Sequence, residues 1–177
     1  MKKKVLVISI LFHAMLLTTA YVFQGVIFPF MRLGGLVPLL LPVTATGIAL
    51  YEGRYTGGIA GLFAGILCDI SFNQPVGVFT VFLTLTGLIV GTMADTVILR
   101  GFVTYYISCT AVLIVSAFIQ MIPLMIRPSP NNIPVNILIP TAIQQTIYSL
   151  VLALPIWFFV RALGNWTDKV SPSGRTY

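Results

Sequence analysis

Charge is what this chain has least of. Only 8% of its 177 residues are Asp, Glu, Lys or Arg, whereas 58% are hydrophobic. A soluble domain with this composition would have too few polar side chains to cover its surface, which excludes an ordinary water-soluble fold. The composition therefore predicts an integral membrane protein, surrounded by membrane lipid.

The chain also lacks the residue sets on which most enzymes and metal sites depend. It has two cysteines, Cys68 and Cys109, and both fall in apolar stretches, where we expect free thiols that pack rather than a disulfide or metal ligands. There is no Walker A motif, no Ser/His/Asp set and no pair of titratable residues expected at similar depth. We therefore predict no enzyme, no cofactor and no metal site.

Long apolar runs are what the chain has instead. A helix needs about 20 apolar residues to cross a hydrocarbon core of about 30 Å, and continuous runs favour helices over the alternating strands of a barrel. The sequence predicts an all-α membrane protein with six transmembrane helices, at residues 5–24, 33–51, 55–72, 76–94, 101–126 and 137–160. Residues 1–166 would form one six-helix domain, and residues 167–177 a short cytoplasmic tail.

The basic residues are unevenly divided between the two sides of these six spans. Two of the ten, Arg32 and Arg127, fall on the side opposite the termini. The other eight fall on the side of the termini: Lys2, Lys3, Lys4, Arg54, Arg100, Arg161, Lys169 and Arg175. The positive-inside rule then predicts that both termini are cytoplasmic, and it explains the net charge of +6 without a nucleic acid partner.

Prolines and glycines interrupt the second and third spans. Pro38 and Pro42 each remove a backbone N–H, so we expect a kink that either fits neighbouring helices or opens a cavity or groove. Gly57, Gly61 and Gly65 recur every four residues, which lets helix backbones approach closely. We interpret all five as helix-packing residues, with a lipid-exposed stripe for an external helix as the alternative for the glycines.

Polar residues gather where the third span begins and ends. An acidic group near hydrocarbon is costly and usually has a function, so Asp69 should either cap the turn that follows it or contact a partner or ligand. The same two possibilities, contact with a partner or organisation of a loop, apply to the whole set: Glu52, Arg54, Asp69, Asn73, Pro75 and Gly77.

His13 lies midway along the first span. A proton relay would need a second titratable group at similar depth, and the sequence supplies none. Glu52 and Asp95 are expected nearer the cytoplasm, and Asp69 is expected nearer the outside. We therefore interpret His13 as a neutral, hydrogen-bonding residue.

The middle of the chain resembles the rod shape-determining protein MreD family. The motifs lie between residues 38 and 91: Pro38-Leu39-Leu40-Leu41-Pro42, Glu52-Gly53-Arg54, a glycine-rich run from Gly57 to Asp69, Pro75-x-Gly77, and Gly87-x-x-x-Gly91. The resemblance implies a non-catalytic subunit of the bacterial elongation (rod) complex in the cytoplasmic membrane. It also implies binding to MreC and, through MreC, to MreB, RodA and a class B transpeptidase, with a role in lateral peptidoglycan synthesis and cell shape.

The same pattern is similar to the substrate-binding S components of energy-coupling-factor vitamin transporters. Both resemblances imply an S-component-like bundle. An S component usually docks its ATPase module through small residues spaced four apart in the first span. Here the nearest matches are Ala14, Thr18 and a lone Ala20, so the docking pattern is degraded and the cell-shape function is favoured.

Overall fold

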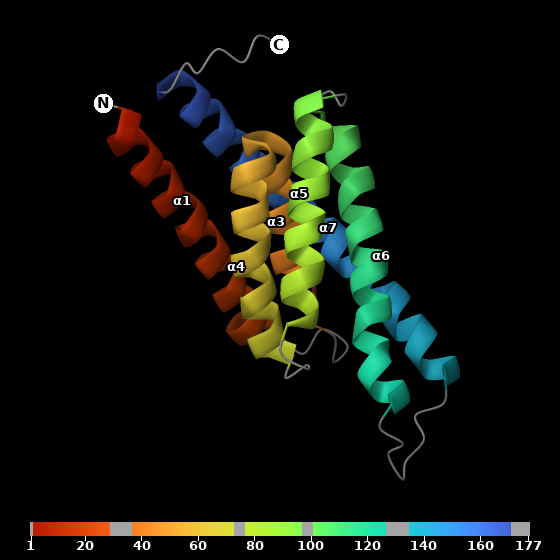
Figure 1. The fold of residues 1–177 in the computed structure, drawn as a ribbon. Coiled ribbons are helices and arrows are strands. Elements are labelled where there is room, and N and C mark those ends of the chain that lie inside the picture. Colours follow the sequence, from red (N-terminus) through yellow and green to blue (C-terminus); the bar gives the residue numbers. More distant parts are fainter. Residues whose placement is uncertain (1, 29–36, 73–76, 97–100, 127–134, 171–177) are drawn as a thin grey trace.

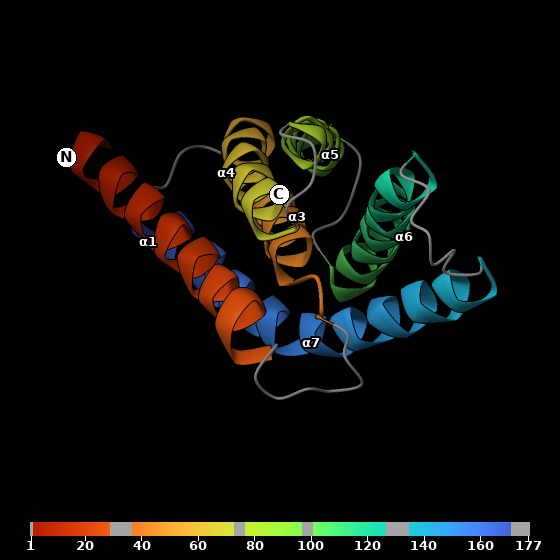
Figure 2. The ribbon, with the colours of Figure 1, turned by 90° about the horizontal axis from the view of Figure 1, so that it is seen from below.

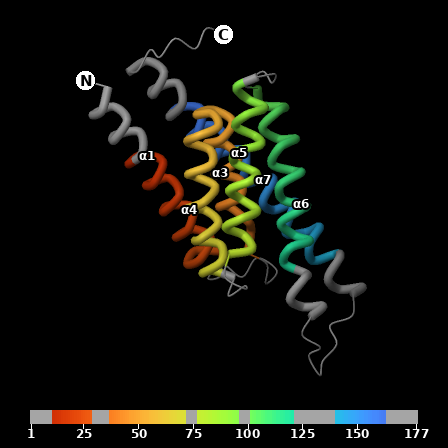
Figure 3. The backbone as a smooth tube through the Cα atoms, viewed as in Figure 1, coloured from red at the N-terminus to blue at the C-terminus, as the bar shows by residue number. Residues whose placement is uncertain are grey.

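The computed structural model describes residues 2–28, 37–72, 77–96, 101–126 and 135–170 (Figure 3). Within these ranges all regular structure is helical, which confirms the predicted all-α class. The elements are α1 (Lys2–Val22), the π-helical segment η1 (Phe23–Ile27), α3 (Leu40–Glu52), α4 (Arg54–Phe72), α5 (Val78–Thr96), α6 (Phe102–Ile126) and α7 (Val135–Val170).

Three of these helices are long and apolar enough to cross a membrane by themselves. The qualifying segments are Val78–Asp95, Phe102–Gln120 and Pro140–Ala162, and α1 and η1 contribute the shorter apolar stretch Leu11–Ile27. Successive helices run in opposite directions, so that the start of α1 and the end of α7 lie at the same end of the bundle, here called the terminal end (Figure 1). The chain is thus a membrane protein. That all six helices cross the membrane stays a prediction.

The short helix α3 lies at the centre of the bundle. Every residue from Pro38 to Tyr51 is buried, and α3 contacts α1, α4, α5, α6 and α7. Figure 2 shows these five helices arranged around it. With 13 residues, α3 is about 20 Å long, less than the roughly 30 Å of a hydrocarbon core. Its neighbours therefore shield it from lipid at both ends.

The two prolines of the second predicted span mark the beginning of α3. Pro38 precedes the helix, and Pro42 is its third residue, so the predicted kink is wrong. The N–H groups of a first helical turn have no acceptor within the helix, and a proline there removes no hydrogen bond. Residues 37–39 are not helical, while residues 33–36 of that predicted span lie outside the described residues.

The last helix is longer than predicted. α7 runs from Val135 to Val170, past both limits of the span expected at residues 137–160, and it continues through Pro140 and Pro155. It therefore includes the first residues of the expected tail at 167–177, and the rest of that tail lies outside the described residues.

Side chains from other helices close the buried start of α3. The backbone N–H of Leu39 donates to Ser149 Oγ at 2.8 Å, from α7. The N–H groups of Leu40 and Leu41 both donate to Gln24 Oε1 of η1, at 2.9 and 3.0 Å. The next residue is a proline without an N–H. The first turn of α3 thus has its donors satisfied by the protein itself, as a helix start away from water requires.

The helices α4 and α5 make the closest helix pair, because their backbones touch along a line of glycines. A Cβ atom on Gly61 would overlap the carbonyl oxygen of Leu83, and one on Gly65 would lie 2.7 Å from the carbonyl oxygen of Phe79. Any side chain at either position would therefore press on the backbone of α5, which cannot move without separating the two helices.

The same line continues toward the terminal end and includes α3. A Cβ on Gly57 would lie 2.6 Å from the Cβ of Ala49 in α3 and 2.8 Å from the carbonyl oxygen of Gly87 in α5. On the α5 side, a Cβ on Gly91 would lie 2.6 Å from the Cα of Arg54. Three helices thus meet at backbone distance, which fixes their mutual spacing.

We expect Gly61→Leu to prevent folding or to destabilise the protein by about 3 kcal/mol or more, since the new side chain has only backbone to displace. Thermal unfolding of the detergent-solubilised protein measures the effect. Gly25→Leu is the matched control, because a Cβ on Gly25 meets nothing within 4 Å. Equal melting temperatures for the two variants would contradict the packing described above.

Candidate functional site

The α4–α5 hairpin carries an aspartate near the end of each helix, and each aspartate binds the start of the other helix. Asp69 precedes the end of α4 by three residues and lies beside the start of α5. Asp95 is the next-to-last residue of α5 and lies beside the start of α4. The two contacts are therefore at opposite ends of the same antiparallel pair.

Asp69 accepts four hydrogen bonds from the start of α5. Its Oδ2 accepts from the N–H of Gly77 at 2.9 Å, the N–H of Thr80 at 3.1 Å and the hydroxyl of Thr80 at 2.6 Å, and its Oδ1 accepts from the N–H of Phe79 at 3.0 Å. The side chain is only 6% exposed. A carboxylate in this place satisfies donors that the helix itself cannot, and it lies at the positive end of the helix dipole.

Asp95 has the corresponding position at the terminal end. Its Oδ2 accepts the N–H of Arg54, the first residue of α4, at 3.1 Å. Gly53, between α3 and α4, has a φ of +86°, and a Cβ there would lie 2.7 Å from Asp95 Oδ1. Glycine is thus required at position 53 both by the backbone conformation and by the nearby carboxylate.

Glu52 ends α3, and His13 of α1 reaches it. The distance from His13 Nε2 to Glu52 Oε1 is 3.4 Å, and His13 is buried. The expectation that no titratable group lies at the depth of His13 is therefore wrong. Because α3 is short, its last residue lies level with the middle of α1 rather than with the start of α1.

The remaining predicted residues have different surroundings. The exposed Arg54 guanidinium lies over the ring of Tyr55, with 5.2 Å to the ring centroid. Gly77 has a φ of +105° and donates to Asp69 as described. Asn73 and Pro75 lie outside the described residues.

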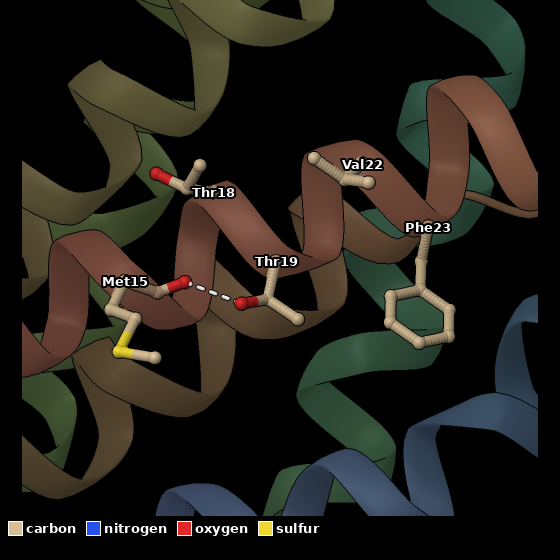
Figure 4. Close-up of a pocket in the computed structure, with 5 residues that line it drawn as sticks. All are labelled: Met15, Thr18, Thr19, Val22 and Phe23. Atoms are coloured by element: carbon tan, nitrogen blue, oxygen red, sulfur yellow. Dashed lines mark hydrogen bonds between the residues drawn. The ribbon is translucent and has the colours of Figure 1, made fainter.

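A shallow hollow of about 340 Å³ lies on the outer side of α1, lined by Met15, Thr18, Thr19, Val22 and Phe23 (Figure 4). The hydroxyl of Thr19 donates to the carbonyl oxygen of Met15 at 2.8 Å, and that of Thr18 donates to the carbonyl oxygen of Ala14 at 2.8 Å. Since both hydroxyls are bonded within their own helix, the hollow offers mainly apolar surface.

Sequence reasoning missed the roles of Asp95, Gln24 and Ser149. Each binds a helix start that is distant in sequence or on another helix, and no local spacing marks such a partner. Cys68 and Cys109 are both free and buried, and the part of the chain that the structure describes holds no group of three His, Cys, Asp or Glu side chains able to bind a metal ion. Asp69, Asp95, Gln24 and Ser149 thus share one role, which is to bind the start of a helix.

We expect Asp69→Ala to destabilise the protein by about 2–5 kcal/mol, because it leaves the first-turn donors of α5 without their acceptor. Hydrogen exchange at Phe79 and Thr80 should accelerate, and chemical unfolding in mild detergent measures the stability. Ser71→Ala is the matched control, since that hydroxyl donates only to its own helix at Leu67 O, and its effect should stay within about 0.5 kcal/mol. Indistinguishable curves for the two variants would show that Asp69 does not hold the hairpin.

Comparison with known proteins agrees with this architecture. The family model described as rod shape-determining protein MreD matches residues 2–166, from the start of α1 to near the end of α7. No curated protein and no solved structure matches the chain. The matched region includes the hairpin, both of its aspartates and the central helix. The chain therefore belongs to the MreD family of rod shape-determining membrane proteins.

Proposed function

We propose that this chain is a non-catalytic membrane subunit of the bacterial elongation complex, which binds MreC and helps to organise lateral peptidoglycan synthesis. Through MreC it would associate with MreB filaments, with RodA and with a class B transpeptidase. The observation that carries this proposal is the family match over nearly the whole helical domain. In this proposal the chain has no chemistry of its own and acts by holding other membrane proteins in place.

The geometry supports a holding function because the hairpin is closely packed and its outer faces are exposed among the described residues. Backbone contact between α4 and α5 and an aspartate contact at each end leave this pair little freedom. Large apolar side chains lie exposed along both helices: Ile59, Phe63, Ile66 and Ile70 on α4, and Val81, Leu85, Ile89 and Met93 on α5. Such faces meet either lipid or the apolar helices of partner proteins.

The vitamin-binding alternative receives no support from the centre of the bundle. The buried start of α3 is a helix N-terminus of the kind that binds ligands in transporters. Here Gln24 and Ser149 already accept the N–H groups of Leu39, Leu40 and Leu41. A ligand at this place would have to displace side chains of the protein itself.

The proposed topology is six spans with both termini in the cytoplasm, in the bacterial cytoplasmic membrane. Its support is the shared end of α1 and α7 in Figure 1 and the eight basic residues that the six-span arrangement places on that side.

We expect an impermeant thiol reagent on intact spheroplasts to label Ser129→Cys and not Ser173→Cys, because these residues would lie on opposite sides of the membrane. The buried Cys68 and Cys109 should add little background. Permeabilised cells, in which both variants should be labelled, provide the control. Labelling of Ser173→Cys in intact spheroplasts would reverse the proposed orientation.

For the proposed function, we expect cross-linking of the tagged full chain in its native membrane, followed by mild solubilisation and mass spectrometry, to recover MreC together with RodA or the transpeptidase. An unrelated tagged six-span protein, expressed at the same level, is the control for non-specific capture. Cross-links from MreC should include residues on the outer faces of α4 and α5. Recovery of ATPase subunits and a transmembrane coupling protein instead would identify a transporter component and overturn the proposal.

A further inference from the structure

One face of α1 and η1 packs against the core. In the stretch from residue 11 to residue 28, the buried residues are His13, Leu17, Ala20 and Gln24. Their spacings of four, three and four residues place them on a single side of the helix. The two apolar residues lie in the middle of this seam, and the two polar residues lie at its ends.

Both polar residues bind α3, one at each end of it. Gln24 Oε1 accepts the N–H groups of Leu40 and Leu41 at the start of α3. His13 Nε2 lies 3.4 Å from Glu52 Oε1 at the last residue of α3. His13 and Gln24 are eleven positions apart, and Leu40 and Glu52 are twelve positions apart. These separations correspond to about 17 and 18 Å of helix, so the antiparallel helices match in length between the two contacts.

The Gln24 contact and the His13–Glu52 contact differ in how unfavourable it would be to break them. Loss of the Gln24 contact would leave backbone donors of α3 without partners inside the bundle, which is strongly unfavourable. The His13–Glu52 contact joins two side chains and leaves the helical hydrogen bonds intact. It also lies at the terminal end, where the exposed charged residues Arg54, Asp95 and Arg161 lie on α4, α5 and α7. If the contact separates, the side chains of His13 and Glu52 can therefore reach the polar surroundings at that end.

The helix itself has an irregular turn beside Gln24. The segment η1 is π-helical from Phe23 to Ile27, and π-helical turns interrupt the regular hydrogen-bond pattern at places where helices change direction. α1 begins eleven positions before His13, and α3 ends at Glu52, which His13 contacts. The first half of α1 therefore extends past the end of α3.

We propose that α1 is a pivoting helix, held at Gln24 of the adjoining η1 and released or retained at its middle by the contact between His13 and Glu52. Separation of that contact lets the terminal half of α1 swing away from α3 while the rest of the bundle keeps its shape. The movement displaces the end of α1 that carries Lys2, Lys3 and Lys4. The inference rests on the described contacts alone and holds whether or not MreC is the partner.

Spin-label distances in the full chain, reconstituted in lipid nanodiscs, test the pivot. One label pair, Leu11→Cys with Tyr55→Cys, reports on the terminal end, and a second, Val26→Cys with Ile70→Cys, reports on the opposite end. All four positions are exposed, and the buried native cysteines are replaced by alanine. A lever of about 20 Å that tilts by about 15° moves its end by about 5 Å, which such measurements resolve.

We expect Glu52→Met and His13→Leu, which each remove the polar contact, to lengthen or broaden the first distance by about 5 Å and to leave the second unchanged. The exchange His13→Glu with Glu52→His should restore the original distance, because it rebuilds the pair. Met15→Ala, on the exposed side of α1, is the control and should change neither distance.

Two results would overturn the pivot. If neither substitution changes the first distance, the pair does not hold α1. If both distances change together, α1 moves as a whole and Gln24 is no pivot. Glu52→Met keeps a side chain of about the same length, so that it remains informative should His13→Leu fail to fold.

Discussion

The structure depends on one constraint of the membrane interior: no water is present to accept the N–H groups at the start of a helix. Each helix start that lies within the bundle must therefore be closed by another part of the chain. Gln24 and Ser149 do this for α3, and Asp69 does it for α5. At the exposed start of α4, Asp95 makes the corresponding contact with the N–H of Arg54. Every one of these contacts joins two helices, so that satisfying the helix starts also assembles the bundle.

The same constraint explains where the few acidic residues of the chain are placed. The chain has four acidic residues, and three of them, Glu52, Asp69 and Asp95, contact a helix start or a histidine of another helix. A carboxylate surrounded by hydrocarbon is tolerated only where its contacts offset the loss of hydration. Three of the four acidic residues are thus used in contacts between helices of the bundle.

Part of this could be predicted from sequence, because it depends on local pattern. The helical class follows from the apolar runs, and the close α4–α5 approach agrees with a glycine at every fourth residue. The contact between Arg54 and Asp95 could not be predicted from the sequence. The two residues are 41 positions apart, and only the register of α4 against α5 brings them together. The histidine partner was missed for a different reason: Glu52 was expected nearer the cytoplasm than His13, whereas the 13-residue α3 ends beside the middle of α1.

The contact between α4 and α5 and the contact between α1 and α3 differ in how much movement they allow. Where α4 meets α5, backbone lies against backbone, and contacts this close leave little room for either helix to shift. Where α1 meets α3, side chains form the seam, and its ends are fixed by polar contacts that differ in how costly they are to separate. A packed core changes between discrete arrangements and does not deform continuously. We therefore expect conformational change in this fold to occur mainly in α1. The α4–α5 hairpin keeps its structure, and α1 moves relative to it.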